Sequence, residues 1–203
     1  YVPGTDQILY SADKGGNEIS HIYLIDKEGT TTDLTPQEEA KAWFAGWSKD
    51  KTHLYFGSNK RDPKFFDLYK MKIGEWDHQL VYQNDQGYSI SDFSWDENYI
   101  ALTQSITTSE NKLFLFDKAN NEMLEISDPE HPGSYGGSGF SKDNKSFYYE
   151  TNATGEFTYL AEYNVTTKVH KDIYKTNWDV QYSYVSETEK YRNGLHAKRQ
   201  WGN

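Results

Sequence analysis

A four-residue motif, an aromatic residue followed by Ser-x-Asp, recurs along this chain at almost constant spacing. The motif serines stand at 48, 94 and 141, which are 46 and 47 residues apart. A short apolar run follows each copy and keeps the same period. A period of about 40 to 50 residues built from several short strands is typical of β-propellers, in which four-stranded blades surround an axis. The three copies are Trp47-Ser48-Lys49-Asp50, Phe93-Ser94-Trp95-Asp96 and Phe140-Ser141-Lys142-Asp143.

Composition favours sheets over disorder. Aromatic residues make up 16% of the 203 residues, although the hydrophobic fraction is only 35%. Aromatic side chains pack well on pleated sheets, whereas disordered chains are poor in them. We therefore predict an all-β chain, a β-propeller of four-stranded antiparallel blades with about four blades plus one extra strand.

The repeat places the blades along the chain. One domain is predicted over residues 1–191, with repeats at about 1–35, 41–83, 88–128 and 135–175 and a partial fifth at 178–191. Residues 192–203 are expected to be a tail outside the fold, added or disordered. The expected strands are residues 7–12, 21–26 and 31–34; 41–47, 52–57, 66–72 and 79–82; 89–93, 99–104, 112–117 and 122–126; 136–140, 146–151, 159–164 and 169–174; and 180–184.

Charge, cysteine content and hydropathy argue against several functions. The formal charge of −10 is opposite to the basic footprint that nucleic acids require. The absence of cysteine excludes disulfides, thiolate metal sites and cysteine catalysis. No apolar run reaches the roughly 18 residues of a membrane span, and the first residues do not resemble a signal peptide. We expect a bacterial, cytoplasmic protein, with a periplasmic or secreted one as the alternative, and neither nucleic acid nor membrane as a partner.

The motif serines and aspartates are interpreted as structural turn residues. Such side chains accept hydrogen bonds from backbone N–H groups two residues on and so fix a turn. The alternative is a metal or substrate site lined by the aspartates, but identical turns on separate blades lie too far apart to share one ion. With 6 histidines and no pair at ligand spacing, no metal or other cofactor is predicted. The turn residues are Ser48, Asp50, Ser94, Asp96, Ser141 and Asp143.

One segment imitates a hydrolase nucleophile. Residues 136–140, Gly-Gly-Ser-Gly-Phe, resemble the Gly-x-Ser-x-Gly elbow that places a serine between a strand and a helix. Here Phe140 takes the last position and no helical pattern follows Ser138, so a crowded innermost strand explains the glycines better. His131 and Asp128 fall in a nearby loop flanked by prolines. No catalytic residue is predicted.

A basic segment in the second repeat is the other candidate for a binding site. Asn59-Lys60-Arg61-Asp62 places an arginine, which suits carboxylate binding, where a loop is expected. The alternative is an ordinary turn in which Arg61 pairs with an acidic neighbour. The sequence leaves both interpretations open.

With the repeats placed, the chain resembles the propeller domain of prolyl-oligopeptidase-type serine peptidases, particularly the bacterial acylaminoacyl-peptidase-like branch. The resemblance covers roughly residues 7–191, and its WD-like repeat core is shared with TolB-type propellers. Residues 193–203 depart from the family, in which the strand continues into an Asn-Asp-Gly-like turn. The segments that carry the resemblance are Ser11-Ala12-Asp13-Lys14-Gly15-Gly16-Asn17-Glu18, Ile22-Tyr23-Leu24, Asp33-Leu34-Thr35-Pro36, Ser58-Asn59-Lys60-Arg61-Asp62, Phe66-Asp67-Leu68-Tyr69 and Trp178-Asp179-Val180.

The resemblance implies a role without catalysis. In that family the propeller caps a separate α/β-hydrolase domain, which carries the catalytic Ser, Asp and His and which only small peptides enter; nothing in this chain matches it. We expect a non-catalytic propeller that gates access to a serine peptidase domain or docks on it. One alternative is a free-standing TolB-like interaction module, and another is an independent enzyme with its site in the central channel. The expected partner is a peptide, a protein or the hydrolase domain of the parent chain, and the chain is a monomer or a homodimer formed through open blade edges.

Closure of the ring has two alternatives. The first repeat has few residues ahead of its strand 7–12, and the fifth supplies one good strand, 180–184. Pairing of these two strands would close a four-bladed ring and remove exposed sheet edges. The other alternative is an open arc of a larger propeller.

Overall fold

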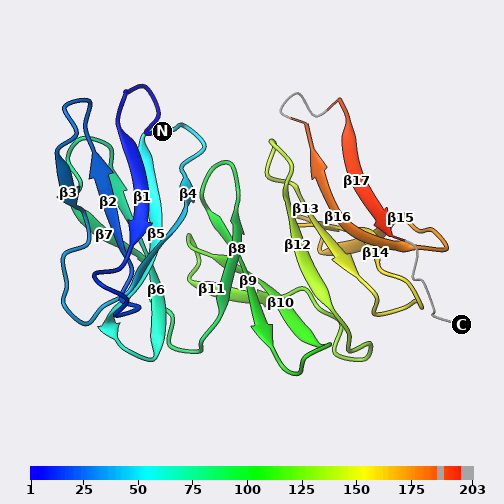
Figure 1. Cartoon of the computed structure of the whole chain (residues 1–203). Helices are drawn as coiled ribbons and strands as arrows, with labels where there is room; N and C mark the ends of the chain where they lie inside the picture. Colours follow the sequence, from blue (N-terminus) through cyan, green and yellow to red (C-terminus); the bar gives the residue numbers. More distant parts are fainter. Residues whose placement is uncertain (187–189, 198–203) are drawn as a thin grey trace, which may run out of the picture. The chain divides into compact units, whose positions relative to one another are not determined.

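The computed structural model describes residues 1–186 and 190–197, and these form 17 β-strands and no helix (Figure 1). Each strand pairs with its neighbour in the sequence, so every sheet is an antiparallel meander. The sheets divide between two compact units, residues 1–87 and residues 88–203. In the described part of the chain, no helix is long and apolar enough to cross a membrane.

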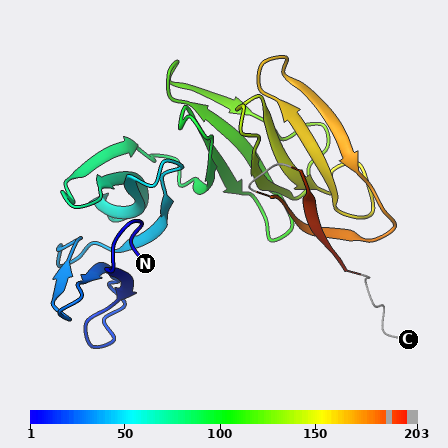
Figure 2. The same cartoon turned by 90° about the horizontal axis from the view of Figure 1, so that it is seen from above.

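The first unit contains a three-stranded and a four-stranded sheet, seen from above in Figure 2. Apolar side chains fill the space between the sheets, with Ile22 and Leu24 on one side and Leu54, Phe56 and Met71 on the other. The strands are β1 (Ile8–Ala12), β2 (His21–Ile25) and β3 (Thr31–Asp33), then β4 (Ala42–Trp47), β5 (His53–Asp62), β6 (Phe65–Lys72) and β7 (His78–Tyr82).

The second unit contains two four-stranded sheets and a two-stranded one. Its core joins Leu113 and Leu115 of one sheet to Phe140, Phe147 and Tyr163 of the next. The strands are β8 (Ser89–Phe93), β9 (Tyr99–Ser105), β10 (Asn111–Asp117) and β11 (Glu122–Glu125), then β12 (Tyr135–Phe140), β13 (Ser146–Thr151), β14 (Tyr159–Asn164) and β15 (Val169–Tyr174), and last β16 (Asp179–Val185) and β17 (Arg192–Ala197).

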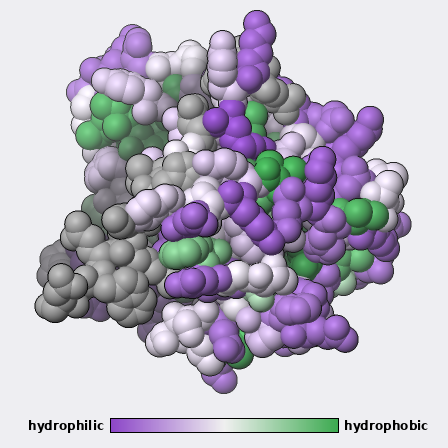
Figure 3. Space-filling model, turned by 90° about the vertical axis from the view of Figure 1, so that its right-hand side faces the viewer, coloured by the Kyte–Doolittle hydropathy of each residue, from purple (hydrophilic) through white to green (hydrophobic). Residues whose placement is uncertain are grey.

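The middle strands of a sheet are more buried than its outermost strand. Runs of consecutive buried residues in β2, β9, β10 and β14 replace strict alternation, as expected for strands covered on both faces. The outermost strand β15 is exposed along its whole length. On the face drawn in Figure 3, hydrophilic side chains predominate and hydrophobic ones form small separate patches.

The first strand of each complete sheet carries a bulge at the same place. The pairing skips Ala45 in β4, Ser91 in β8 and Ser138 in β12, each three residues before the motif serine. Space is limited there, because a Cβ added to Gly137 would lie 2.8 Å from the Oγ of Ser91 on the neighbouring sheet. Crowding therefore explains the glycine at 137, as the sequence predicted for this strand.

Four-stranded antiparallel sheets are confirmed, and nearly all predicted strand ends lie within one residue of those observed. The clear exception is β5, which continues through residues 59–62, where a loop was expected. A second difference lies in the expected tail, because residues 192–197 form β17 and give β16 a hydrogen-bonded partner. The ring-closing alternative pairs residues 180–184 with 7–12; within the fifth sheet β16 pairs with β17, and ring closure stays a prediction.

Candidate functional site

The recurring motif forms the turn between the first two strands of a blade. Ser94 Oγ donates to Asp96 Oδ1 over 2.6 Å and accepts the N–H of Tyr99 over 2.9 Å. Asp96 Oδ1 also accepts the N–H of Asn98 over 3.1 Å. The copies that begin at Ser48 and Ser141 make the same three bonds. Each motif therefore closes its own turn.

The backbone hydrogen bond that closes this turn also occurs at two places that lack the Ser-x-Asp motif. In each turn the first N–H donates to the carbonyl five residues on, as in Ser94 to Tyr99 over 3.0 Å. The same bond joins Val2 to Gln7 over 2.9 Å and Ser186 to Tyr191 over 2.8 Å. One such turn thus lies between the first two strands of each of the four later sheets, and one lies ahead of β1 in the first sheet, whereas the sequence motif marked only three of these five turns.

The motif carboxylates are held ionised, each in its own turn. The hydroxyl of Ser48 and then Thr52 lower the pKa of Asp50 to about 2. Burial of Asp96 opposes ionisation, yet the bonds from Ser94 and Asn98 leave its pKa below the ordinary value. Groups with such pKa values do not exchange protons near neutral pH. Among the described residues no cluster of three or more His, Asp or Glu could hold a metal ion.

Ser138 occupies a hydrogen-bonded position, and none of its described partners is a histidine. Its Oγ lies 2.7 Å from Glu150 Oε1 and 2.8 Å from Ser183 Oγ. His131 is paired with Asp128 through an Nδ1 to Oδ2 distance of 2.8 Å. The strand β13, not a helix, follows β12. In the described part of the chain, no histidine is bonded to Ser138. Residues 136–140 therefore resemble a nucleophile elbow in sequence but do not form one.

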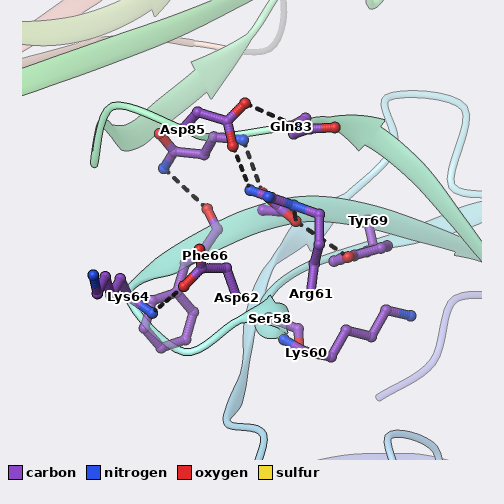
Figure 4. Close-up of polar contacts among 11 residues, drawn as sticks. Ser58, Lys60, Arg61, Asp62, Lys64, Phe66, Tyr69, Gln83 and Asp85 are labelled. Carbon is purple, nitrogen blue, oxygen red and sulfur yellow. Dashed lines mark hydrogen bonds and ion pairs between the residues drawn. The ribbon is translucent and has the colours of Figure 1, made fainter.

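The guanidinium of Arg61 forms ion pairs with two carboxylates. Its Nε donates to Asp67 Oδ2 over 2.6 Å and one Nη lies 2.8 Å from Asp85 Oδ1, and Figure 4 shows the side chain directed toward Asp85. Asp67 is fully buried. Burial opposes its ionisation, but Arg61 and the N–H of Asn84 keep its pKa below the ordinary value. Of the two interpretations of this segment, the pairing of Arg61 with acidic neighbours is the one observed.

Lys60 is likewise held within the fold. Its Nζ lies 4.0 Å from the ring centroid of Tyr69 and 2.9 Å from Nδ1 of His78. His78 Nε2 in turn lies 2.7 Å from the carbonyl oxygen of Leu34, which ties the second sheet to the first. Burial lowers the pKa of both Lys60 and His78. Residues 59–62 therefore connect the two sheets of the first unit and do not form a free recognition loop.

Aromatic side chains are exposed on the first strands of two sheets. Trp43 and Phe44 of β4 are 37% and 43% exposed, and Tyr182 and Tyr184 of β16 are 50% and 53% exposed. The two tyrosine rings stack with centroids 6.3 Å apart. First strands are innermost in a propeller blade. The chemistry that these rings themselves offer is contact and hydrogen bonding.

Comparison with known sequences assigns a family to nearly the whole chain. The family model described as the prolyl oligopeptidase N-terminal β-propeller domain matches residues 3–191. Dipeptidyl aminopeptidase BIII of Pseudoxanthomonas mexicana is 38% identical over 82 residues, which are 39% of this chain and 12% of that protein. The β-propeller predicted from the repeat is confirmed.

Solved structures agree on the fold. TolB from Acinetobacter baumannii superposes with a TM-score of 0.64 and 13% identity, over 94% of this chain and 47% of that one. Prolyl oligopeptidase B from Galerina marginata gives 0.66 and 16% identity, over 94% and 30%. A chain from a study of two prolyl endopeptidases gives 0.69 and 14% identity, over 95% and 30%. The chain thus spans less than half the length of these proteins.

Proposed function

Because this chain belongs to the family of prolyl oligopeptidase N-terminal β-propeller domains, we propose that it is the non-catalytic propeller domain of a serine peptidase. In this role it gates access to a separate hydrolase domain or docks on it. The observation that carries the proposal is the family match over residues 3–191. It is supported by the bonding of Ser138 to Glu150 and Ser183, with no histidine bonded to the serine in the described part of the chain.

The second candidate is a free-standing interaction module. It is favoured by the likeness to TolB, which extends over 94% of this chain. That likeness concerns the fold alone, whereas the curated relative that shares 38% identity is a peptidase. We therefore place the peptidase domain first. In either role the partner is a peptide, a protein or a hydrolase domain.

Two measurements test the proposal. The purified chain is incubated with chromogenic peptide and ester substrates and with a fluorophosphonate probe. We expect neither turnover nor labelling, because Ser138 stands on a strand that leads into another strand, and no described histidine is bonded to it. Labelling of Ser138, or turnover that disappears in Ser138→Ala, would contradict a non-catalytic role.

The second measurement is the parent reading frame. We expect it to continue into a strand, a Gly-x-Ser-x-Gly turn and a helix, the arrangement of a hydrolase nucleophile. A frame that encodes no such segment would favour the interaction module. If the segment is found, small and large peptide substrates are compared in the whole protein, and equal rates for both would contradict gating.

A further inference from the structure

Lys60 and His78 form a pair that the proposed function does not use. The Nζ atom of Lys60 lies 2.9 Å from Nδ1 of His78. His78 Nε2 lies 2.7 Å from the carbonyl oxygen of Leu34, which can only accept a hydrogen bond. The neutral ring therefore carries its proton on Nε2 and presents a lone pair on Nδ1 to the amine. An amine beside a base that a third group orients is the arrangement of an activated nucleophile.

The positive charge of Lys60 is not held by an ion pair within its unit. The structure describes all of residues 1–87, and none of their carboxylates lies within ion-pair distance of the Lys60 amine, whereas Arg61 binds two. The aromatic rings of Tyr69 and Phe56 cover the amine instead, with centroids 4.0 and 5.9 Å from Nζ. A lysine amine in apolar surroundings is a better nucleophile than one in water, because less of it is protonated.

Burial acts on both members of the pair. It lowers the pKa of Lys60, against a smaller opposing effect of Asp67. It also lowers the pKa of His78, although the carbonyl of Leu34 and the carboxylate of Asp77 oppose it, so the ring is neutral and able to accept a proton at neutral pH. The amine therefore gives up its proton more readily than an exposed lysine does.

The pair is accessible, and an apolar side chain lies beside it. Lys60 on β5 and His78 on β7 are both partly exposed. Leu80 is 50% exposed and stands opposite Tyr69 in the pairing of β6 with β7. Side chains opposite each other across antiparallel strands are neighbours on one face of the sheet. A small molecule that reaches the amine therefore meets an apolar surface next to the Tyr69 ring. The arrangement uses residues 34–80 alone.

We propose that Lys60 captures an aliphatic aldehyde as an imine, with His78 as the proton acceptor and Leu80 against the hydrocarbon chain. Lys60 passes one proton to Nδ1 of His78, and the freed lone pair forms a C–N bond to the carbonyl carbon. The carbonyl oxygen takes up that proton and a second one from the nitrogen, and it leaves as water. No oxidant or further reactant is required. The inference goes beyond the proposed function, and imine formation and gating can each fail without the other.

The test is a brief exposure of the 203-residue chain to butanal, followed by borohydride, which reduces an imine to a stable amine. Mass spectrometry of the peptides then gives the extent of reaction at each lysine. Lys64 is the internal reference, because it is exposed in the same hairpin and Figure 4 shows it directed away from Lys60. At neutral pH we expect Lys60 to react at least about tenfold faster than Lys64. Equal rates would overturn the proposal.

The dependence on pH tests the role of His78. In His78→Gln the reaction of Lys60 should fall at least about fivefold at neutral pH. It should match that of the unchanged chain at a pH of about 10, where solvent removes the proton from the amine. An unchanged rate at neutral pH, or an equal loss at both pH values, would contradict His78 as the proton acceptor. His131→Gln, in the other unit, is the control and should change nothing.

The class of aldehyde is tested at Leu80. The excess of reaction at Lys60 over Lys64 should be smaller with glyceraldehyde than with butanal, because a hydroxylated chain gains nothing from an apolar contact. Leu80→Ser should lower the excess with butanal and leave it unchanged with glyceraldehyde. An excess that is the same for both aldehydes would contradict the assignment of Leu80. Urea unfolding confirms that each variant is folded.

Discussion

The Oδ1 atom of Asn144 accepts the backbone N–H of Trp95 over 2.7 Å, so the turn of one blade is bonded to the turn of the preceding blade. The indole of Trp95 completes the contact, because its Nε1 donates to the carbonyl oxygen of Phe140 over 3.3 Å. Both residues belong to the motif turns described above. These turns therefore join neighbouring sheets in the second unit as well as joining strands within a sheet.

The bond between Asn144 and Trp95 can be removed without changing the backbone. Asn144 has a φ of 58°, a left-handed conformation that glycine adopts without steric cost. We expect Asn144→Gly to lower the free energy of unfolding by about 1 kcal/mol through loss of the acceptor. Asn121 has a φ of 53° and serves as the control; Asn121→Gly should change stability by less than about 0.5 kcal/mol. Equal effects in urea unfolding would show that the bond adds nothing.

The cost of replacing a motif serine should increase with the burial of its side chain. Ser94 is fully buried and Ser141 is partly exposed, although their hydroxyls make the same bonds. Ser94→Ala removes a buried hydroxyl and leaves the N–H of Tyr99 without its acceptor, and we expect a loss of about 1–3 kcal/mol. Ser141→Ala should cost less, because water can replace the hydroxyl. Melting temperatures of the two variants test the order, and a larger loss in Ser141→Ala would contradict it.

Acid should weaken the turn at Asp50. The pKa of Asp50 is lowered from 3.8 to about 2, chiefly by the hydroxyl of Ser48. The folded state therefore favours the carboxylate, which stabilises the fold above pH about 4, and this contribution is lost as the pH falls toward 2. Removal of the donor in Ser48→Ala should return the pKa toward 3.8. Carboxyl NMR titrations test this, and an unchanged pKa would show that Ser48 is not the main cause.

The two carboxylates of Arg61 should differ in importance. Arg61→Met leaves the buried Asp67 without its cation, and we expect the larger loss of stability in this variant. Asp85 has a side chain that is 53% exposed, so Asp85→Asn should cost only about 0–1 kcal/mol. Urea unfolding of both variants gives the comparison. If Asp85→Asn lowered stability as much as Arg61→Met, the exposed pair of Arg61 with Asp85 would stabilise the fold as much as the buried pair with Asp67.

The blades could be predicted because their signals are local. Apolar runs and turn residues recur at a regular spacing along the sequence. The ends of most strands were therefore predicted to within one residue. The Val2 turn was missed because its frame is a backbone bond from Val2 to Gln7 and its side-chain bonds come from Thr5 instead of a Ser-x-Asp motif. Only the spacing could have revealed it, since residue 2 precedes the serine at 48 by one period.

Contacts between distant residues could not be predicted. The sequence offered many acids for Arg61, and strand pairing decides that Asp67 and Asp85 are the ones within reach. Arg192 fell in the expected tail and gave no signal, because its neighbours Tyr148 and Ser183 belong to other strands.

The meander pattern of the sheets also bears on how this chain acquires its structure. No described strand pairs with one further along than its immediate neighbour in the sequence, so the loops that must close are short and their entropic cost is small. Chains dominated by such local pairing fold faster than those that depend on distant pairing. We therefore expect the strands of one blade to pair early, whereas the apolar core between two sheets forms only once the neighbouring blade is present.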